Sequence, residues 1–105
     1  MRKVILITGA AKGIGRGIVE ELSKDDENEI IVNFNKSEKD ARELKERIGQ
    51  NIEIYKADIT NKTEVDSMVD YIINKYPRIK DKVDYLIEEL LRYYPDLNNT
   101  GLIAF

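Results

Sequence analysis

The stretch VILITGAAKGIGRGIVEEL, residues 4–22, contains the strongest structural signals of the chain. Its first four residues form a continuous apolar run, which is typical of a strand buried on both faces. Residues 8–9 interrupt that run. Apolar residues then recur with helical spacing at Ile14, Ile18, Val19 and Leu22. The stretch therefore predicts a buried strand that turns into a helix through a glycine-rich loop.

The glycines of this loop suit an anion site. The first turn of a helix has backbone N–H groups without intrahelical partners and carries partial positive charge. Gly9 can make the tight turn, Gly13 lets a phosphate approach the backbone, and Gly15 lets helix and strand pack closely. The spacing G-x3-G-x-G differs from the G-x-G-x-x-G dinucleotide fingerprint. The alternative is a plain strand–turn–helix corner whose glycines serve packing alone.

Composition limits the function classes. The chain has 105 residues, which fits one domain, and its net charge of −3 argues against a general nucleic-acid or membrane-surface binder. It has no cysteine and no histidine, so a thiolate site, a histidine base and a metal site are not expected. No run has transmembrane length and no signal peptide is recognised. We therefore expect a soluble cytoplasmic protein.

A second strand and helix follow. Residues 29–34 are apolar and β-branched enough to form a strand. Ser37 is suited to the N-cap of the next helix, with Asp40 as a weak capping-box partner. Gly49 is a plausible stop for that helix.

The third strand–helix unit follows the same scheme. Residues 52–57 alternate as a half-buried edge strand does. Asn61 with Glu64 can cap the next helix, and Pro77 ends or bends it. The helix has apolar positions at Val65, Met68, Val69, Ile72, Ile73 and Tyr76. Strand–helix units in alternation predict an α/β fold with a parallel sheet and right-handed crossovers.

The string TGAAKGIG, residues 8–15, resembles the cofactor loop of short-chain dehydrogenase/reductases, and above all the 3-oxoacyl-carrier-protein reductase branch. A second resemblance is the segment Ala57-Asp58-Ile59-Thr60, which is similar to the Asp-Val-Thr segment of that family. The resemblance covers residues 1–79. It implies a Rossmann-like fold and a cofactor site that includes Gly9, Lys12, Gly13, Ile14 and Gly15. It also implies that the Asp58 carboxylate meets the adenine amino group and that the Ile59 backbone lies under the ring.

The segment after the second strand bears on cofactor choice. Dinucleotide folds place an acid about twenty residues after the loop, where it binds the ribose and repels a 2′-phosphate. Here the corresponding segment is Asn33-Phe34-Asn35-Lys36-Ser37, without an acid. Lys36, Ser37 and Lys12 together favour NADP(H) over NAD(H). The alternatives are that the lysines are solvated, that Ser37 is only a helix cap, and that no cofactor is bound.

The resemblance ends in the last quarter of the chain. Residues 79–94 have an apolar stripe that favours a helix, although 83–87 also reads as a short strand. Residues 102–105 predict a last strand beside the first one. The expected fold is a three-layer parallel sheet of about four strands in the order 3-2-1-4, within one truncated Rossmann-like domain over residues 1–105.

The catalytic pattern of the family is a Ser together with Tyr-x-x-x-Lys. Tyr71 and Lys75 have this spacing, but they fall on the third helix, which has a packing pattern. Tyr76 and Lys80 flank Pro77. We therefore assign no catalytic residue, and whether the chain by itself is an enzyme stays open.

Two functions fit these sequence features. The first is the NADP(H)-binding portion of a short-chain reductase, catalytically incomplete as the chain stands. The second is a non-enzymatic truncated, recombined or engineered scaffold that self-associates through helix 79–94 or the edge of strand 102–105. A weaker third is another phosphate ligand, such as flavin mononucleotide.

Overall fold

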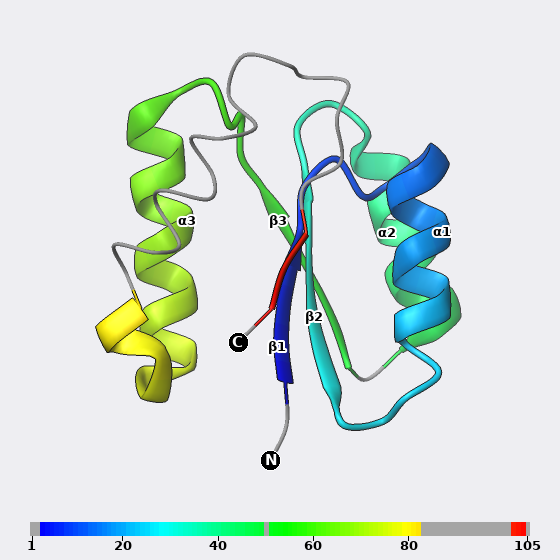
Figure 1. Ribbon diagram of the computed structural model, residues 1–105. Helices are drawn as coiled ribbons and strands as arrows, with labels where there is room; N and C mark the ends of the chain where they lie inside the picture. Colours follow the sequence, from blue (N-terminus) through cyan, green and yellow to red (C-terminus); the bar gives the residue numbers. More distant parts are fainter. Residues whose placement is uncertain (1–2, 50, 83–101, 105) are drawn as a thin grey trace.

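The computed structural model describes residues 3–49, 51–82 and 102–104, which form an α/β fold (Figure 1). Strand–helix units alternate along the chain. In order, the elements are β1 (Lys3–Ile7), α1 (Gly13–Leu22), β2 (Asn28–Phe34), α2 (Glu38–Ile48), β3 (Ile52–Lys56), α3 (Lys62–Lys75), the 3-10 helix η1 (Pro77–Lys82) and β4 (Leu102–Ala104).

The sheet has the strand order β3-β2-β1-β4, which confirms the predicted order. β1 pairs in parallel with β2, and β2 with β3. β4 pairs with β1 in the antiparallel direction, with Ile7 opposite Leu102 and Ile5 opposite Ala104. The prediction of an all-parallel sheet is therefore wrong for this strand. Three apolar residues can pair in either direction, and their pattern does not encode a direction.

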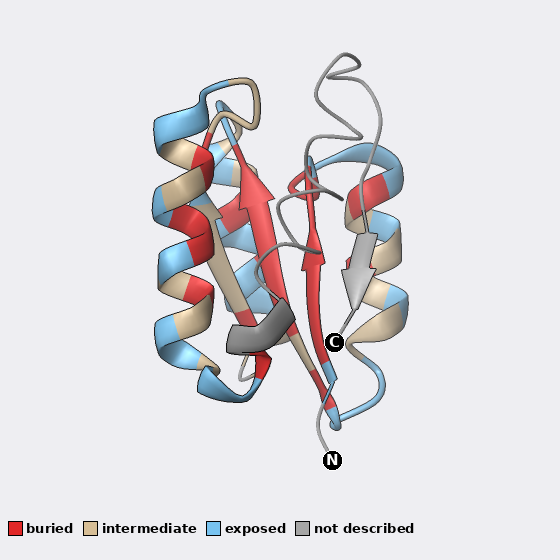
Figure 2. Ribbon diagram, turned by 60° about the vertical axis from the view of Figure 1, so that its left-hand side comes forward, coloured by how far each residue is buried: buried red, intermediate tan, exposed pale blue. Residues whose placement is uncertain are grey.

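Helices cover both faces of the sheet, so the fold has three layers. α1 and α2 lie on one face and α3 on the other (Figure 1). The residues of β1 alternate between the two cores. Ile5 and Ile7 belong to the cluster of α1 and α2, whereas Val4 and Leu6 belong to that of α3. This is why residues 4–7 form an uninterrupted apolar run, and Figure 2 shows the strand buried beyond its exposed first residue.

α3 begins and ends close to the predicted residues. The Asn61 side chain accepts a hydrogen bond from the Glu64 N–H at 3.2 Å, as an N-cap does. α3 ends at Lys75, and η1 begins at Pro77. A 3-10 helix therefore occupies the start of the helix predicted over 79–94; the remainder of that prediction lies outside the described residues.

α2 has the predicted ends but not the predicted cap chemistry. Ser37 is its N-cap residue, but its side chain makes no cap hydrogen bond. Gly49 ends the helix with φ 97°, and its N–H donates to the carbonyl of Lys45 at 2.8 Å. The expected capping box of Ser37 and Asp40 is thus not formed.

Candidate functional site

The three parallel strands end at one edge of the sheet, which is uppermost in Figure 1. The loops that follow them span residues 8–12, 35–37 and 57–61. They contain seven of the ten predicted cofactor residues, and the other three, Gly13, Ile14 and Gly15, follow the first loop in the first turn of α1. Ligands of open α/β sheets bind outside the carboxyl ends of such strands. The fold therefore brings the predicted residues to the edge where a ligand is expected.

The glycine loop is open above the backbone. Gly9 and Gly13 have φ values of 58° and 59°, in the left-handed region that favours glycine. A Cβ atom built on either residue would meet no atom within 4 Å. At the start of α1, the N-cap residue Lys12 makes no side-chain cap hydrogen bond, and the first turn has no acidic residue. The loop thus leaves room for an anion at the helix N-terminus.

Ile14 lies in the first turn of α1 and is 80% exposed, in contrast to the prediction that it belongs to the apolar face of the helix. It is the one large hydrophobic side chain exposed in the described part of the chain. Val19 is buried, and Ile18 and Leu22 are half-buried against the same core. The exposed apolar side chain and the open glycines are therefore neighbours at the carboxyl edge.

Lys12 pairs with the first turn of α2. Its Nζ lies 3.6 Å from Oδ2 of Asp40, and the Lys12 side chain is 66% exposed. Asn35 and Lys36 are exposed and Ser37 is half-buried. The Asp40 carboxylate, expected to cap α2, contacts the predicted phosphate-binding lysine instead.

Asp58 is held by its own turn after β3. Its Oδ1 accepts hydrogen bonds from the Thr60 hydroxyl at 2.6 Å and the Thr60 N–H at 2.9 Å. These bonds lower the pKa of the Asp58 carboxyl below its usual value, and the charge of Lys36 acts in the same direction. The Asp58 N–H donates to Oε1 of Glu64 at 3.1 Å. The site therefore presents a fixed, ionised carboxylate beside the half-buried Ile59.

The side chains of Asn33 and Arg16 connect the first loop with other segments near the site, and neither was predicted from the sequence. Asn33, near the end of β2, is 3% exposed and contacts both the glycine loop and Ala57. Arg16 of α1 pairs with Glu43 of α2 at 3.1 Å and donates to the Ala11 carbonyl at 3.4 Å. In the sequence, Asn33 stands out as a polar residue within the apolar run of β2, and this could have marked it as a functional candidate. No feature of the sequence distinguishes Arg16 in this way.

The residues with catalytic spacing serve the packing of α3. Tyr71 and Lys75 both donate to the carboxylate of Glu53 on β3. Tyr76 donates to Oε2 of Glu29 at 2.7 Å. Glu29 and Glu53 are each the second residue of a strand, so these contacts lie toward the amino ends of the strands. They are remote from the glycine loop.

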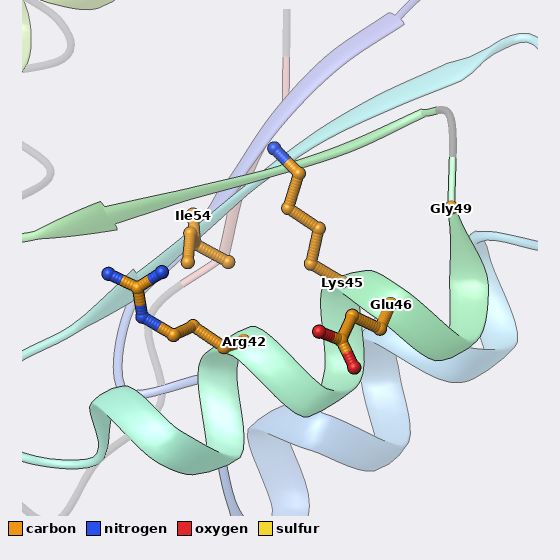
Figure 3. Close-up of a pocket in the computed structure, with 5 residues that line it drawn as sticks. All are labelled: Arg42, Lys45, Glu46, Gly49 and Ile54. Atoms are coloured by element: carbon orange, nitrogen blue, oxygen red, sulfur yellow. The ribbon is translucent and has the colours of Figure 1, made fainter.

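A surface hollow lies between α2 and β3 (Figure 3). Arg42 and Lys45 extend from α2 toward β3, with Ile54 lying between their ends. Glu46 and Gly49 complete the lining. None of the predicted cofactor residues lines this hollow, so it is separate from the carboxyl-edge site.

The model of the short chain dehydrogenase family matches residues 3–101. A 3-oxoacyl-[acyl-carrier-protein] reductase of Buchnera aphidicola is 32% identical over 102 residues, 97% of this chain and 36% of that protein. A hydroxynaphthalene reductase-like protein of Metarhizium guizhouense is 46% identical over 66 residues, 60% of this chain and 24% of that protein. The chain thus spans about a quarter to a third of the length of these curated relatives.

Solved structures show the same fold. A serine dehydrogenase complexed with NADP+ is similar over 63% of this chain and 25% of that one, with a TM-score of 0.56 and 27% identity. A short chain dehydrogenase of Burkholderia cenocepacia matches over 72% of this chain and 31% of its own, with a TM-score of 0.62 and 24% identity. Among the residues that the structure describes, no helix is long and apolar enough to cross a membrane.

Proposed function

Because this chain belongs to the short-chain dehydrogenase family, we propose that it binds NADP(H) at the carboxyl edge of its sheet. We further propose that residues 1–105 are one cofactor-binding domain of a reductase. The observation that carries the proposal is the open glycine loop at the start of α1, beside the exposed Ile14.

The loop supports dinucleotide binding by its shape. A phosphate would occupy the space above Gly9 and Gly13 that a Cβ would enter, and N–H groups at the start of α1 would donate to it. Gly15 is buried and lets the helix approach the sheet. Ile14 would then cover part of the cofactor and lose its exposure to water.

Cofactor choice is proposed to depend on the two lysines of the site. Lys12 and Lys36 would face the 2′-phosphate of NADP(H), with Asn35 and the Ser37 hydroxyl at the start of α2. Asp58 and the backbone of Ile59 would contact the adenine. The NADP+ complex of the similar serine dehydrogenase supports the same cofactor class.

Hydride transfer is the chemistry that the nicotinamide would supply. The described chain binds and orients the cofactor, whereas Tyr71 and Lys75 are engaged by Glu53. We propose that the Ser and the Tyr-x-x-x-Lys pair of the reductase come from a longer product or from another chain. Substrate and reaction then belong to the complete protein.

Titration of the protein with NADPH and with NADH, followed by nicotinamide fluorescence, tests the proposal. The chain has no tryptophan, so nicotinamide emission is free of that overlap. We expect saturable NADPH binding that is tighter than NADH binding. Absence of binding of both would contradict the proposal and favour the non-enzymatic scaffold.

Two glycine variants provide a matched comparison. Gly13→Ala places a Cβ at φ 59° in the open loop, and Gly49→Ala places one at φ 97° beyond the end of α2. Gly13→Ala should cost about 1 kcal/mol of folding free energy because an L-residue is strained in the left-handed region. Gly49, with φ 97° and ψ −120°, lies outside that region in a conformation that L-residues rarely adopt, so Gly49→Ala should cost about 1–3 kcal/mol. Only Gly13→Ala should abolish NADPH binding. Equal binding by the two variants would show that the loop does not hold the cofactor.

A further inference from the structure

We propose that Asn33 is a positioning residue, which sets the spacing between the glycine loop and the Asp58 turn. The inference rests on the proposed function, since these two segments would hold the phosphates and the adenine of one cofactor. Asn33 itself is buried, with 3% of its surface exposed, and so acts through its neighbours.

The side chain of Asn33 joins the segments on both sides of β2. Its Oδ1 accepts from the N–H of Gly9 at 3.4 Å, and its Nδ2 donates to the carbonyl of Ala57 at 3.0 Å. Gly9 follows β1 and Ala57 follows β3, and each is 24 residues from Asn33 along the chain. One amide therefore spans the width of three strands at the edge where the site lies.

Backbone hydrogen bonds reinforce the same two connections. The N–H of Ala10 donates to the Asn33 carbonyl at 3.0 Å, and the N–H of Ala57 donates to the Phe34 carbonyl at 2.9 Å. These bonds fix each segment to the end of β2. The side-chain amide adds the link that sets their separation, because an apolar side chain could neither accept from Gly9 nor donate to Ala57.

A polar side chain at position 33 is unexpected, because the residue that precedes it on this face of β2 is apolar. On the same face of β2, Ile31 belongs to the apolar core under α3. A buried polar side chain is tolerated when its polar atoms are bonded, and both polar atoms of Asn33 are. An apolar residue of similar size would serve the core equally well, so the amide is explained by the segments that it joins.

The same strand contains a matched control. Asn28 starts β2 at the opposite edge and is 7% exposed. The side-chain Nδ2 of Asn28 donates to the Leu22 carbonyl at 2.8 Å, and the backbone carbonyl of Asn28 accepts from Nδ2 of Asn51 at 2.9 Å. Asn28 is thus a buried amide whose side chain makes one of these bonds, where that of Asn33 makes two, and it contacts none of the predicted cofactor residues.

Asn33→Leu and Asn28→Leu separate positioning from stability. Both variants should unfold at lower urea concentration than the parent protein. At a temperature where each is folded, Asn33→Leu should bind NADPH about tenfold more weakly, whereas Asn28→Leu should bind as the parent does. Unchanged NADPH binding by Asn33→Leu, or equal weakening in both variants, would overturn the inference.

Hydrogen exchange gives a readout that needs no cofactor. In Asn33→Leu the amides of Gly9, Ala57 and Asp58 should exchange faster, and Asn28→Leu should leave them unchanged. If the parent protein fails to bind NADPH, the proposed function fails, and this exchange pattern alone decides whether Asn33 joins the two segments. A response in only one segment would contradict the joint role.

If Asn33→Leu does not fold, Asn33→Asp tests the same inference. It keeps an acceptor toward Gly9 and removes the donor to Ala57. Exchange should then rise at Ala57 and Asp58 more than at Gly9. Equal protection of all three amides, as in the parent, would count against the inference.

Discussion

At the scale of single residues, Asp40 forms an ion pair with Lys12, one of the lysines proposed to bind the 2′-phosphate of NADP(H). Its Oδ2 lies 3.6 Å from the Nζ of Lys12, which is exposed enough for the two anions to exchange. Asp40→Asn should therefore raise NADPH affinity by about two- to fivefold, the worth of one surface ion pair. NADH affinity should change little, because NADH has no 2′-phosphate.

The comparison for Asp40 is Asp66→Asn on α3. Asp66 pairs with Lys62 at 3.0 Å, also at the surface, and away from the site. Fluorescence titration at low salt should show no change in this variant. A parallel rise in NADPH and NADH affinity in Asp40→Asn would mean that the carboxylate acts on the phosphates common to both cofactors.

Asp58 should make stability depend on pH. Its bonds to Thr60 lower the pKa of the folded state below the usual 3.8. The stabilisation is therefore complete above that value and is lost as pH falls through the lower pKa of the folded state. Urea unfolding on acidification from about pH 5 should show a smaller loss for Asp58→Asn than for the parent. Superimposable profiles would contradict a structural role for this carboxylate.

Sequence reasoning placed single residues well where local spacing determines them. Gly9, expected to make the tight turn after the first strand, has a left-handed φ of 58°. It missed Asn33, whose partners are each 24 residues away. It also placed Ile14 on the packed face of α1, whereas Ile14 is 80% exposed although its neighbour Gly15 is buried.

At the scale of elements, the two predicted N-cap residues should contribute differently to the folding free energy. Asn61 accepts a hydrogen bond from the Glu64 N–H, whereas Ser37 makes no side-chain cap bond to α2. Asn61→Ala should cost about 1 kcal/mol of folding free energy. Ser37→Ala should cost only a few tenths, roughly the residual preference for a polar N-cap. Chemical denaturation checks both, and an equal cost would show that Ser37 does cap α2 in solution.

The ends of the elements could be predicted from local sequence, but the direction of the last strand could not. α3 ends before Pro77, as predicted, since proline disrupts the hydrogen bonding of an α-helix. The position of β4 beside β1 was also predicted correctly. Its antiparallel direction was not, because direction depends on the path of the preceding chain rather than on the residues of the strand.

At the scale of the whole molecule, the two-sided core explains why the fold could be predicted. Core residues of β1 alternate between the α1–α2 face and the α3 face, so the apolar run of residues 4–7 already specifies a sheet covered on both sides. The place of the candidate site, at the carboxyl edge, then follows from parallel pairing. What could not be predicted are the contacts between loops, Lys12 with Asp40 and Asn33 with Ala57, since they form only after the strands assemble.

Cofactor binding should also raise the stability of the whole domain. A ligand that binds only the folded chain at about 100 times its dissociation constant adds about 2.7 kcal/mol to the free energy of unfolding. For a domain of this size that corresponds to a rise of roughly 10 °C or more in Tm. NADPH should produce this shift in the parent protein and in Gly49→Ala, and none in Gly13→Ala. The glycine loop and Gly49 lie at opposite ends of the sheet. An equal rise in Tm in both glycine variants would therefore place the bound cofactor away from the start of α1.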